Sequence, residues 1–497
     1  MKLSELTNGL CAVIAEKGVK QLITLSNQAL SLGADLVELR LDLLEEEFSI
    51  PDILRSISGP KLVTIRRKSD GGSWIQDEQT RINFLLQAQQ FGAQAIDVES
   101  DCFHHFQASD LCLRILSFHH FAETPNNINA LHKQFESLQP DLVKIACLAN
   151  KNSDVVRILG LYDQAKIPLI AFCMGSIGFP SRILSLTKKS PWMYANFSLE
   201  MVNAPGIPTL NDVRAIYDLK NLSTQTDIFG VVGDPIGHSM SPVIHNACYQ
   251  FLGYNGVYLP FHVATADFEA ALKGYECLPV KGYSVTIPHK EKAFQFASSC
   301  SSLVKEIGAA NTLVKTKDGF YAENTDATGI LAALENRLGN TLLGRKVLIL
   351  GAGGVSRAAV FALKKAGCIV HITNHNRDRA EKLALEAKVI CLDWNNRHNF
   401  NSGLLLNCTP VGMDPLVNET PWDSNSFSKD HIVFDTVYNP IETRFLMEAK
   451  KAQAITIDGL EMFVCQAAEQ FKLFTSLSAS LDVMRNTAMK KLRKTEV

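Results

Sequence analysis

The chain has 497 residues, too many for a single hydrophobic core, so its length predicts two or three domains. Hydrophobic residues make up 46% of the chain and charged residues 20%, which is ordinary for a soluble globular protein. The net charge of −2 provides no basic field for nucleic acid or for an anionic membrane, so we expect neither as a partner.

The N-terminal segment and the cysteines indicate a reducing compartment. Glu5 and polar residues stand where a signal peptide needs its apolar stretch, and no apolar run is long enough to span a bilayer. Because no plastid transit peptide is recognisable either, we expect a cytoplasmic protein, most simply a bacterial one. The twelve cysteines are scattered and never form CxxC, which favours free thiols. His371 and His375 are four apart at the end of an expected strand, where that spacing does not bring both to one face, and we expect no metal site.

Short apolar runs alternate with amphipathic segments through the first half of the chain. The runs are 11–14, 34–42, 61–67, 93–99, 113–120, 141–148, 168–175 and 192–198. Eight strand–helix units predict a (β/α)8 barrel, whose active site lies at the carboxyl ends of the strands. An open doubly wound sheet is the alternative, because periodicity alone does not show that a sheet closes.

Polar residues stand two apart at the ends of three of these strands. The pairs are Glu38 with Arg40, Asp97 with Glu99, and Ser117 with His119. A spacing of two places both side chains on one face of a strand. Unpaired charges inside a barrel are costly, so these residues either form a satisfied ion-pair layer or bind a ligand. Three pairs at the same end of the strands favour a ligand.

Lys144 lies in the middle of the apolar strand DLVKIACL, where a lysine is rare. If its side chain points inward, burial and the neighbouring Arg40, Arg66 and His119 disfavour the ammonium form. A neutral amine attacks ketones to give a Schiff base. The alternative is a lysine that reaches solvent or pairs with Asp97 or Glu99. Taken alone, the lysine favours that alternative.

In its linear order, the first half resembles type I 3-dehydroquinate dehydratase over residues 5–220. The matching segments are VELRLD, TIRRKSDGG, IDVE, SFHHF, TP, DLVKIA, MGSIGFPSR and NAPG. The resemblance implies that Lys144 forms the Schiff base and that His119 moves protons, and strand parity favours His119 over His120. It also implies that substrate is bound by Glu38, Arg40, Arg66, Arg182 and Asn203.

The implied reaction begins when the Lys144 amine condenses with the C3 ketone of 3-dehydroquinate. The iminium acidifies the C2 proton, and His119 takes that proton and returns one to the departing C1 hydroxyl. The implied product is 3-dehydroshikimate.

Three positions depart from the family pattern. Asp70 replaces a glutamate that orients the histidine, so we expect that contact to be longer or rearranged. Asn203 replaces a serine and keeps a hydrogen-bonding side chain. Ile207 replaces a glutamine, and losing one such contact costs about 1 kcal/mol. We therefore expect weaker substrate binding rather than lost chemistry.

The stretch from Asn203 to Ser241 joins two halves of different pattern. A polar run ending at Asp227 leads into the buried strand IFGVVG and a Gly/Ser turn. We expect Ser241 to be a helix N-cap with Pro242 at the first helical position. The hydroxyls of Ser239 and Ser241 would then lie at a helix N-terminus suited to a carboxylate, and plain capping is the alternative.

Further polar residues follow short strands. GYSVTIPHK reads as a strand with Thr286 near its end and Lys290 just beyond, whereas Asn311 and Asp326 fall in expected loops. A surface lysine and a turn aspartate are the default interpretations of Lys290 and Asp326.

The segment 346–367 reads as a strand, a glycine loop and a helix. Gly351 and Gly353 fit GxGxxG, and Ser356 stands in the place of the third glycine. The next strand ends at Asn374, where an NAD enzyme usually carries an acidic residue. The cationic candidates His375, Arg377 and Arg379 follow, a pattern that favours the 2′-phosphate of NADP.

The second half, in its linear order, resembles shikimate dehydrogenase over residues 228–497. The matching segments are GDPIGHSMSP, VTIPHK, GAANTL, NTDATG, GAGGVSRAA, NCTPVGM, DTVYNP and DGLEMFVCQAAEQF. The resemblance implies a catalytic pair of Lys290 and Asp326, with hydride moving from the nicotinamide to the C3 ketone of 3-dehydroshikimate. It implies substrate binding by Ser239, Ser241, Thr286, Asn311, Tyr438 and Gln466. It implies NADP(H) contacts at Gly351, Ala352, Gly353, Gly354, Asn374, His375, Arg377, Arg379 and Gly459. His375 replaces a second arginine of the family, which predicts a softer and pH-dependent phosphate contact.

The two resemblances imply consecutive reactions on one chain. The expected domains are a (β/α)8 barrel over 1–222, a substrate-binding domain over 228–330 completed by helices at 465–497, and a Rossmann NADP-binding domain over 331–464. The expected partners are small-molecule substrates, and a monomer is compatible with the sequence. The alternatives are an impaired dehydratase half, a dehydrogenase that uses quinate and NAD, and a non-catalytic metabolite-binding protein on the same folds.

Overall fold

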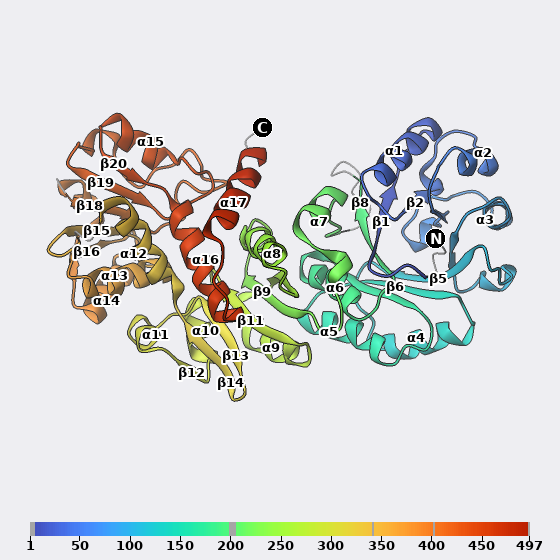
Figure 1. The fold of residues 1–497 in the computed structure, drawn as a ribbon, viewed down its shortest axis with the longest axis horizontal. Helices are drawn as coiled ribbons and strands as arrows, with labels where there is room; N and C mark the ends of the chain where they lie inside the picture. Colours follow the sequence, from blue (N-terminus) through green and yellow to red (C-terminus); the bar gives the residue numbers. More distant parts are fainter. Residues whose placement is uncertain (1–4, 198–204, 340–341, 401–402, 496–497) are drawn as a thin grey trace. The chain divides into compact units, whose positions relative to one another are not determined.

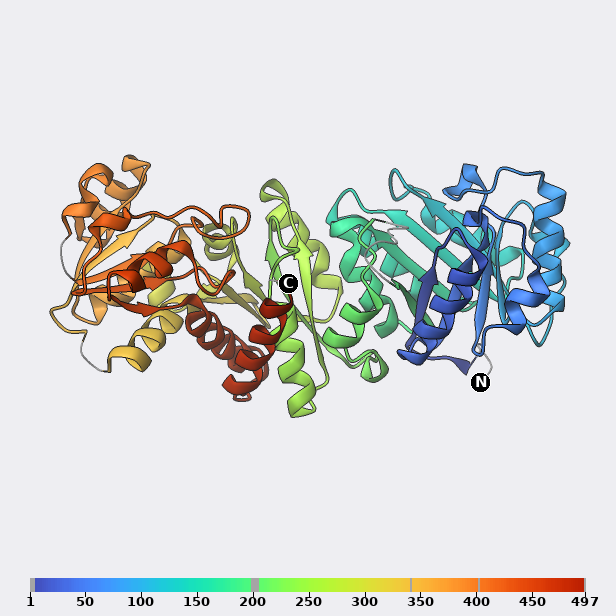
Figure 2. The same cartoon turned by 90° about the horizontal axis from the view of Figure 1, so that it is seen from above.

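The structure, a computed structural model, describes residues 5–197, 205–339, 342–400 and 403–495. The chain divides into two compact units (Figures 1 and 2). The first unit is Met1–Asp227 with Asn255–Val263 and Ala270–Pro279, and the second is Ile228–Tyr254, Ala264–Glu269 and Val280–Val497. No helix in the described part of the chain is long and apolar enough to cross a bilayer.

An eight-stranded parallel sheet lies at the centre of the first unit, with helices around its outside (Figure 1). The strands are β1 Gly9–Ile14, β2 Leu36–Arg40, β3 Lys61–Thr64, β4 Ala95–Glu99, β5 Leu113–His120, β6 Leu142–Leu148, β7 Leu169–Met174 and β8 Trp192–Asn196. The helices are α1 Val19–Ser31, α2 Ile50–Arg55, α3 Glu78–Gln90, α4 Ile128–Ser137, α5 Asn152–Gly160, α6 Gly175–Thr187 and α7 Leu210–Ile216. Seven of the eight predicted apolar runs contain one of these strands, and β1 begins two residues before the run 11–14.

The order of the strands is that of a barrel. It runs β7-β6-β5-β4-β3-β2-β1-β8, so β8 pairs with β1 and chain neighbours are sheet neighbours. Within the described residues no pairing joins β7 to β8, and the barrel is nearly closed. The predicted (β/α)8 barrel is confirmed, and the alternative of an open doubly wound sheet is wrong.

The barrel interior consists of an apolar layer and a polar layer. Alternate residues of each strand face inward, and the apolar cluster includes Leu36, Ala95, Ile115 and Leu142. Two residues further along the same strands stand the polar residues Glu38, Asp97, Ser117 and Lys144. This two-residue step places the charged side chains toward the carboxyl ends of the strands.

Two six-stranded sheets follow in the chain. The first has the order β10-β9-β11-β13-β14-β12 and the second the order β17-β16-β15-β18-β19-β20. The strands of the first are β9 Asp227–Gly233, β10 Gly256–His262, β11 Val280–Val285, β12 Ser299–Cys300, β13 Thr312–Thr316 and β14 Gly319–Glu323. The strands of the second are β15 Lys346–Leu350, β16 Ile369–Thr373, β17 Ile390–Cys391, β18 Gly403–Asn407, β19 His431–Asp435 and β20 Ile455–Ile457. The helices of this half are α8 Ser241–Leu252, α9 Phe268–Gly274, α10 Lys290–Phe296, α11 Ser302–Ile307, α12 Thr325–Leu338, α13 Gly354–Lys365, α14 Arg377–Ala387, α15 Arg444–Lys451, α16 Gly459–Thr475 and α17 Leu481–Thr495.

The last sheet has the strand order of a Rossmann fold. β15 is flanked by β16 on one side and by β18 on the other, and both strands run parallel to it. The order therefore reverses at β15, and in such sheets ligands bind beyond the carboxyl ends of the strands at this point. The predicted Rossmann fold is confirmed.

The start of α8 differs from our expectation. The helix begins at Ser241 itself, the preceding Met240 already has helical φ and ψ of −82° and −9°, and no side chain caps the helix. Ser239 Oγ accepts a hydrogen bond from Ser241 N at 3.3 Å. The predicted N-cap role of Ser241 is wrong, because the turn that ends at Met240 already carries the helical conformation.

Candidate active sites

One pocket lies at the carboxyl ends of the barrel strands. Six sequence-predicted residues line it: Glu38, Arg40, Arg66, His119, Lys144 and Arg182. Two of the three departing positions, Asp70 and Ile207, line it as well, whereas Asn203 lies outside the described residues. Sequence reasoning missed other lining residues, among them Thr64, Phe121, Phe172, Met174 and Tyr194.

Lys144 points into the barrel and is only 4% exposed. Its Nζ lies 3.0 Å from Asp97 Oδ2 and 3.5 Å from Glu38 Oε1, and 4.2 Å from the centre of the Tyr194 ring. The inward orientation agrees with our expectation, but the closest charges are carboxylates rather than the expected arginines. Pairing with Asp97 is present, and pairing with Glu99 is not.

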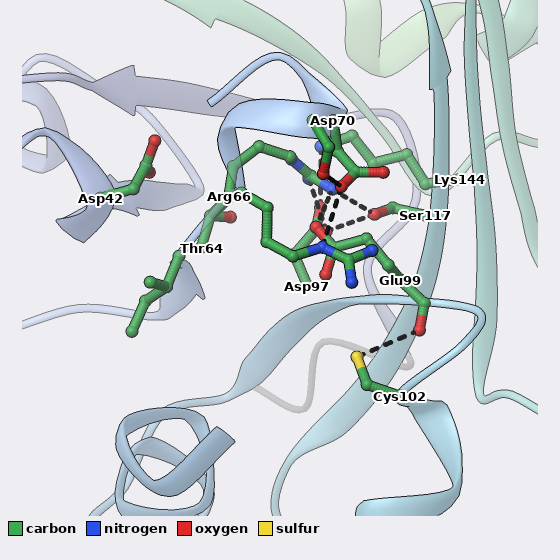
Figure 3. A network of polar contacts seen from close by, with 12 residues as sticks. Asp42, Thr64, Arg66, Asp70, Asp97, Glu99, Cys102, Ser117 and Lys144 are labelled. Atoms are coloured by element: carbon green, nitrogen blue, oxygen red, sulfur yellow. Dashed lines mark hydrogen bonds and ion pairs between the residues drawn. The ribbon is translucent and has the colours of Figure 1, made fainter. Parts of the chain in front are cut away.

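Arg66 joins the carboxylates of this layer into a network (Figure 3). Its Nη2 lies 2.6 Å from Asp97 Oδ1, and its Nη1 donates to Glu99 Oε1 at 2.9 Å and to Ser117 Oγ at 2.8 Å. Burial would raise the pKa of Asp97, but Arg66 and Lys144 outweigh it and hold that pKa far below its usual range. The polar layer is thus a satisfied ion-pair layer and a pocket wall at the same time.

Arg81 extends the network away from the pocket. This fully buried residue of α3 donates to Glu99 Oε2 at 2.8 Å, to the carbonyl of Ile65 and to Cys102 Sγ at 3.2 Å. Burial raises the pKa of Glu99 in spite of Arg66 and Arg81. Arg81 could not be predicted from periodicity, because its partners Ile65, Glu99 and Cys102 lie outside its own helix.

His119 stands on β5 with the inward parity that we predicted. Its Nδ1 is buried and has no hydrogen-bond partner among the described residues. Burial, together with Arg66 and Lys144, lowers the pKa of His119 well below its ordinary value, so the imidazole is neutral at neutral pH. By contrast, His120 Nδ1 accepts from the backbone N of Glu123 at 3.1 Å. The neutral imidazole of His119 therefore lines the pocket.

Asp70 does not orient His119. Its Oδ2 accepts hydrogen bonds from Arg67 Nε at 2.9 Å and from Ser69 Oγ at 2.7 Å. The expected contact is rearranged. Asp70 lies in the pocket wall, at the end of the short 3-10 helix Lys68–Asp70, and its carboxylate is bound by neighbours in the chain rather than by His119.

Of the three predicted arginines, Arg182 alone has no carboxylate partner within the described chain. Arg40 pairs with Asp42 through two hydrogen bonds of 2.9 and 2.8 Å, and Arg66 is paired as above. Arg182, on α6, is 2% exposed, its Nη2 donates to the carbonyl of Pro205 at 3.3 Å, and its guanidinium lies 4.4 Å from the Phe172 ring centre. Burial lowers the pKa of Arg182 to about 10. A buried cation without an anion is suited to a carboxylate ligand.

A second pocket lies in the second unit. All six predicted substrate ligands line it together with Lys290 and Asp326: Ser239, Ser241, Thr286, Asn311, Tyr438 and Gln466. Gly459, predicted as a cofactor contact, lines it too. Sequence reasoning missed Ser284, Val355, Thr436, Met462, Phe463 and Gln470, which carry no distinctive spacing.

Lys290 and Asp326 form a buried pair in this pocket. The lysine is the first residue of α10, and its Nζ donates to Asp326 Oδ2 at 2.5 Å. The aspartate lies in the first turn of α12 rather than in the expected loop, because Asn324 caps that helix. Asn311 Nδ2 donates to Asp326 Oδ1 at 3.0 Å and thereby fixes the carboxylate. The default interpretations, a surface lysine and a turn aspartate, are both wrong.

Tyr438 is a neutral hydroxyl donor at the edge of the pocket. Its ring stacks on Phe463 with centroids 4.2 Å apart, and burial raises the pKa of Tyr438 to about 12. It therefore keeps its proton at physiological pH.

The glycine loop between β15 and α13 leaves no room for a side chain at Gly351. Gly351 has φ of +117°, and a Cβ there would lie 2.9 Å from Ser356 Oγ and 3.1 Å from Cys408 O. Gly353 N donates to Ser356 Oγ at 3.2 Å. Ser356 therefore suits the third glycine position, because its hydroxyl accepts the hydrogen bond from the loop amide at the N-terminus of α13.

The residues after β16 form a cationic cluster at the other end of the predicted cofactor site. Asn374 is buried and its Nδ2 donates to the carbonyl of Asn376, whereas His375 and Arg379 are exposed. Arg377 is paired with Glu381 at 2.6 Å. Arg379 has no ion pair with any described residue, which leaves its charge available. The residues present thus fit a dinucleotide that carries a 2′-phosphate.

Three family models match the chain. The model for type I 3-dehydroquinase matches residues 10–224. The models for the shikimate dehydrogenase substrate binding domain and the shikimate 5'-dehydrogenase C-terminal domain match residues 231–313 and 459–489.

Curated proteins are similar to both halves. The chain is 34% identical over 498 residues to the bifunctional 3-dehydroquinate dehydratase/shikimate dehydrogenase, chloroplastic, of Arabidopsis thaliana, with 95% of this chain and 82% of that protein covered. It is 35% identical over 272 residues to the shikimate dehydrogenase (NADP(+)) of Bacillus cereus (strain AH820), covering 53% of this chain and 98% of that protein.

Solved structures resemble the second half. A shikimate dehydrogenase in complex with NADP+ is 33% identical with a TM-score of 0.52 and covers 54% of this chain and 96% of its own. The shikimate dehydrogenase of Aquifex aeolicus is 34% identical with a TM-score of 0.50 and covers 53% of this chain and 98% of its own.

Proposed function

This chain belongs to the family of bifunctional 3-dehydroquinate dehydratase/shikimate dehydrogenases, and we propose that its two pockets each carry one of the two reactions. The enzyme dehydrates 3-dehydroquinate to 3-dehydroshikimate and reduces 3-dehydroshikimate to shikimate with NADPH. The observation that carries the assignment of residues is that each unit holds a buried lysine, 4% exposed at Lys144 and 8% at Lys290, in a pocket with an acid–base partner.

Lys144 is the nucleophile of the dehydratase. Its unprotonated amine adds to the C3 ketone, and loss of water from the adduct gives an iminium that acidifies the C2 proton. His119 is supported as the base by its lowered pKa and its place in the same pocket. The imidazole takes the C2 proton and then donates a proton to the departing C1 hydroxyl. Hydrolysis of the product iminium frees the lysine.

Arg182 binds the substrate carboxylate. Arg40 and Arg66 are neutralised by Asp42 and by Asp97 with Glu99, so they position neighbouring groups rather than supply an uncompensated charge. A carboxylate on Arg182 would replace the missing counter-ion and restore a normal pKa to the guanidinium.

Ile207 weakens substrate binding. This residue lies in the pocket wall and packs against the apolar cluster of the barrel. Because its side chain has neither donor nor acceptor, one hydroxyl of the substrate loses a partner, at a cost of about 1 kcal/mol.

Lys290 and Asp326 carry the reduction. As hydride reaches the C3 ketone, negative charge develops on its oxygen, and the Lys290 ammonium stabilises or protonates that oxygen. Asp326, held by Asn311, keeps the ammonium in place. Ser239, Ser241, Thr286 and Tyr438 are hydroxyl groups in the same pocket and bind the carboxylate and hydroxyls of the substrate.

The glycine loop and the cationic cluster hold NADP(H), which supplies the hydride when bound. The N-terminus of α13, which begins at Gly354, would hold the pyrophosphate. His375 and Arg379 bind the 2′-phosphate, with Arg377 held back by Glu381.

Borohydride reduction tests the dehydratase assignment directly. Incubation with 3-dehydroquinate and sodium borohydride should add one substrate-derived mass to the peptide that contains Lys144. An unmodified Lys144 in a protein that still dehydrates substrate would refute the Schiff base. The domain boundaries expected from the sequence, the cytoplasmic location and the oligomeric state stay predictions.

A further inference from the structure

The amine of Lys144 has three close neighbours, and one of them is a ring face. Asp97 Oδ2 lies at 3.0 Å, Glu38 Oε1 at 3.5 Å and the Tyr194 ring centre at 4.2 Å. Tyr194 is on β8, opposite Cys11 in the register of β1, and is 4% exposed. The amine therefore touches a desolvated π face inside the barrel.

Both carboxylates are shared with other donors, whereas the ring is not. Asp97 also accepts from Arg66 and Ser117, and Glu38 Oε1 accepts from Thr64 Oγ1 at 2.7 Å. Within the described chain, Lys144 is the only cation placed over the Tyr194 ring. The Tyr194 hydroxyl has no hydrogen-bond partner among the described residues. Tyr194 thus interacts with the Lys144 amine through its ring face rather than through its hydroxyl.

The nitrogen changes its hydrogen-bonding capacity but not its charge when it becomes an iminium. A lysine ammonium has three N–H donors for its carboxylate partners, and a protonated Schiff base has one. The iminium must therefore give up hydrogen bonds to Asp97 or Glu38 while it remains cationic. A ring face attracts a cation without requiring a donor, so its share of the stabilisation grows at this step.

We propose that Tyr194 is a catalytic residue of the dehydratase, its ring face stabilising the cationic nitrogen that forms at Lys144. This inference rests on the proposed Schiff base. Burial, with Glu38 and Cys11 nearby, raises the pKa of Tyr194 well above its ordinary value, so the ring is a neutral phenol. Phe172, whose ring centroid is 6.3 Å from that of Tyr194, packs beside this ring. Arg182 lies over Phe172 instead, so Lys144 and Arg182 each have their own aromatic face.

A fluorination series separates this role from simple packing. Tyr194→Phe is the reference, and 4-fluoro, 3,5-difluoro and 3,4,5-trifluoro-phenylalanine are placed at the same position. Successive fluorines withdraw electron density from the ring face and leave its shape nearly unchanged. We expect the single-turnover dehydration rate and the fraction of Lys144 trapped by borohydride to fall stepwise, by about tenfold over the series.

The same substitutions at Phe118 are the control. Phe118 precedes His119 on β5, faces the opposite side of the strand and packs on Phe135 of α4 at 5.5 Å. Fluorination there should produce no trend, and the Tm of the barrel should stay constant in every variant as a measure of folding. A flat series at Tyr194, with the unsubstituted protein trapped normally, would overturn the role of the ring. Absence of trapping in the unsubstituted protein would refute the Schiff base itself.

Discussion

Gly354 and Lys290 are in such close contact that a Cβ atom on residue 354 would lie 2.9 Å from Cδ of the lysine. Gly354, the first residue of α13, thus lies against the side chain of Lys290. The glycine that opens the cofactor helix is also the glycine that leaves room for the lysine.

Gly354→Ala should lower the turnover of the dehydrogenase. The added methyl must displace the Lys290 side chain, and a small displacement of a catalytic group can cost up to about a hundredfold in rate. We expect kcat for 3-dehydroshikimate reduction to fall at least tenfold. At Gly353, a Cβ would meet no atom within 4 Å, so Gly353→Ala should act mainly on the KM for NADPH. Steady-state kinetics of both variants test this, and an unchanged kcat in Gly354→Ala would contradict it.

Arg182→Met should impair substrate binding without destabilising the barrel. Losing a charge-assisted contact to the carboxylate costs about 2–3 kcal/mol, which is roughly a hundredfold in kcat/KM. Because Arg182 has no counter-ion among the described residues, its removal leaves no buried charge unpaired, and Tm should stay the same or rise. Arg66→Met is the contrast, since it strands Asp97 and Glu99 and should cost about 3–5 kcal/mol of folding stability. Equal loss of Tm in both variants would show that Arg182 is structural.

Ile207→Gln should strengthen binding of 3-dehydroquinate. The glutamine would offer a donor and an acceptor at the pocket wall, worth about 1 kcal/mol or a fivefold lower KM. Ile207→Leu controls for changed packing and should not lower the KM. If the KM of Ile207→Gln equals that of the leucine variant, the position does not reach the substrate.

Asp435 should make the stability of the Rossmann sheet pH-dependent. Burial raises its pKa from 3.8 to about 7 in spite of hydrogen bonds from Thr443, Val437 and Asn407. A carboxyl whose pKa is higher in the folded state stabilises the fold while it is protonated. The protonated carboxyl therefore contributes fully to the free energy of unfolding below about pH 4. This contribution, at most roughly 4 kcal/mol, is lost as the pH rises through 7.

Asp435→Asn tests this contribution. The amide oxygen can keep the hydrogen bonds from Asn407 and Val437, and its NH2 can donate to the Thr443 hydroxyl. Hydrogen exchange of the β19 amides at pH 5.5 and pH 8 should show a smaller pH effect in the variant than in the unchanged protein. The same pH effect in both would contradict the raised pKa.

The strands, the face of the strand on which their polar residues lie, and the glycine loop could be predicted from the sequence. Inward parity at Lys144 and His119 follows from a period of two, and Gly351 needs its positive φ whatever the surrounding fold. Pairings across the barrel were out of reach. Lys144 meets Asp97 and Glu38 rather than Glu99, because strand tilt and long side-chain rotamers decide which carboxylate an amine reaches.

Residues without a chemical signature were missed for a related reason. In the sequence, Tyr194 is one aromatic residue in an apolar strand. Its ring lies beside the Lys144 amine only because β8 pairs with β1 in the barrel. The prediction that Ser241 caps α8 was wrong because the preceding residue, Met240, already has helical backbone angles. Local sequence patterns therefore predict which strand face or loop carries each reactive group. Long-range packing determines which residues these groups contact, and that could not be predicted.

The central claim is that one chain carries two reactions, each dependent on its own lysine. The most direct measurement supplies 3-dehydroquinate and NADPH to the unchanged protein, to Lys144→Ala and to Lys290→Ala, and follows both the products and NADPH. The unchanged protein should form shikimate. Lys144→Ala should leave 3-dehydroquinate untouched yet still reduce added 3-dehydroshikimate, and Lys290→Ala should accumulate 3-dehydroshikimate without oxidising NADPH. Loss of both activities in either variant, with its fold intact, would contradict the claim.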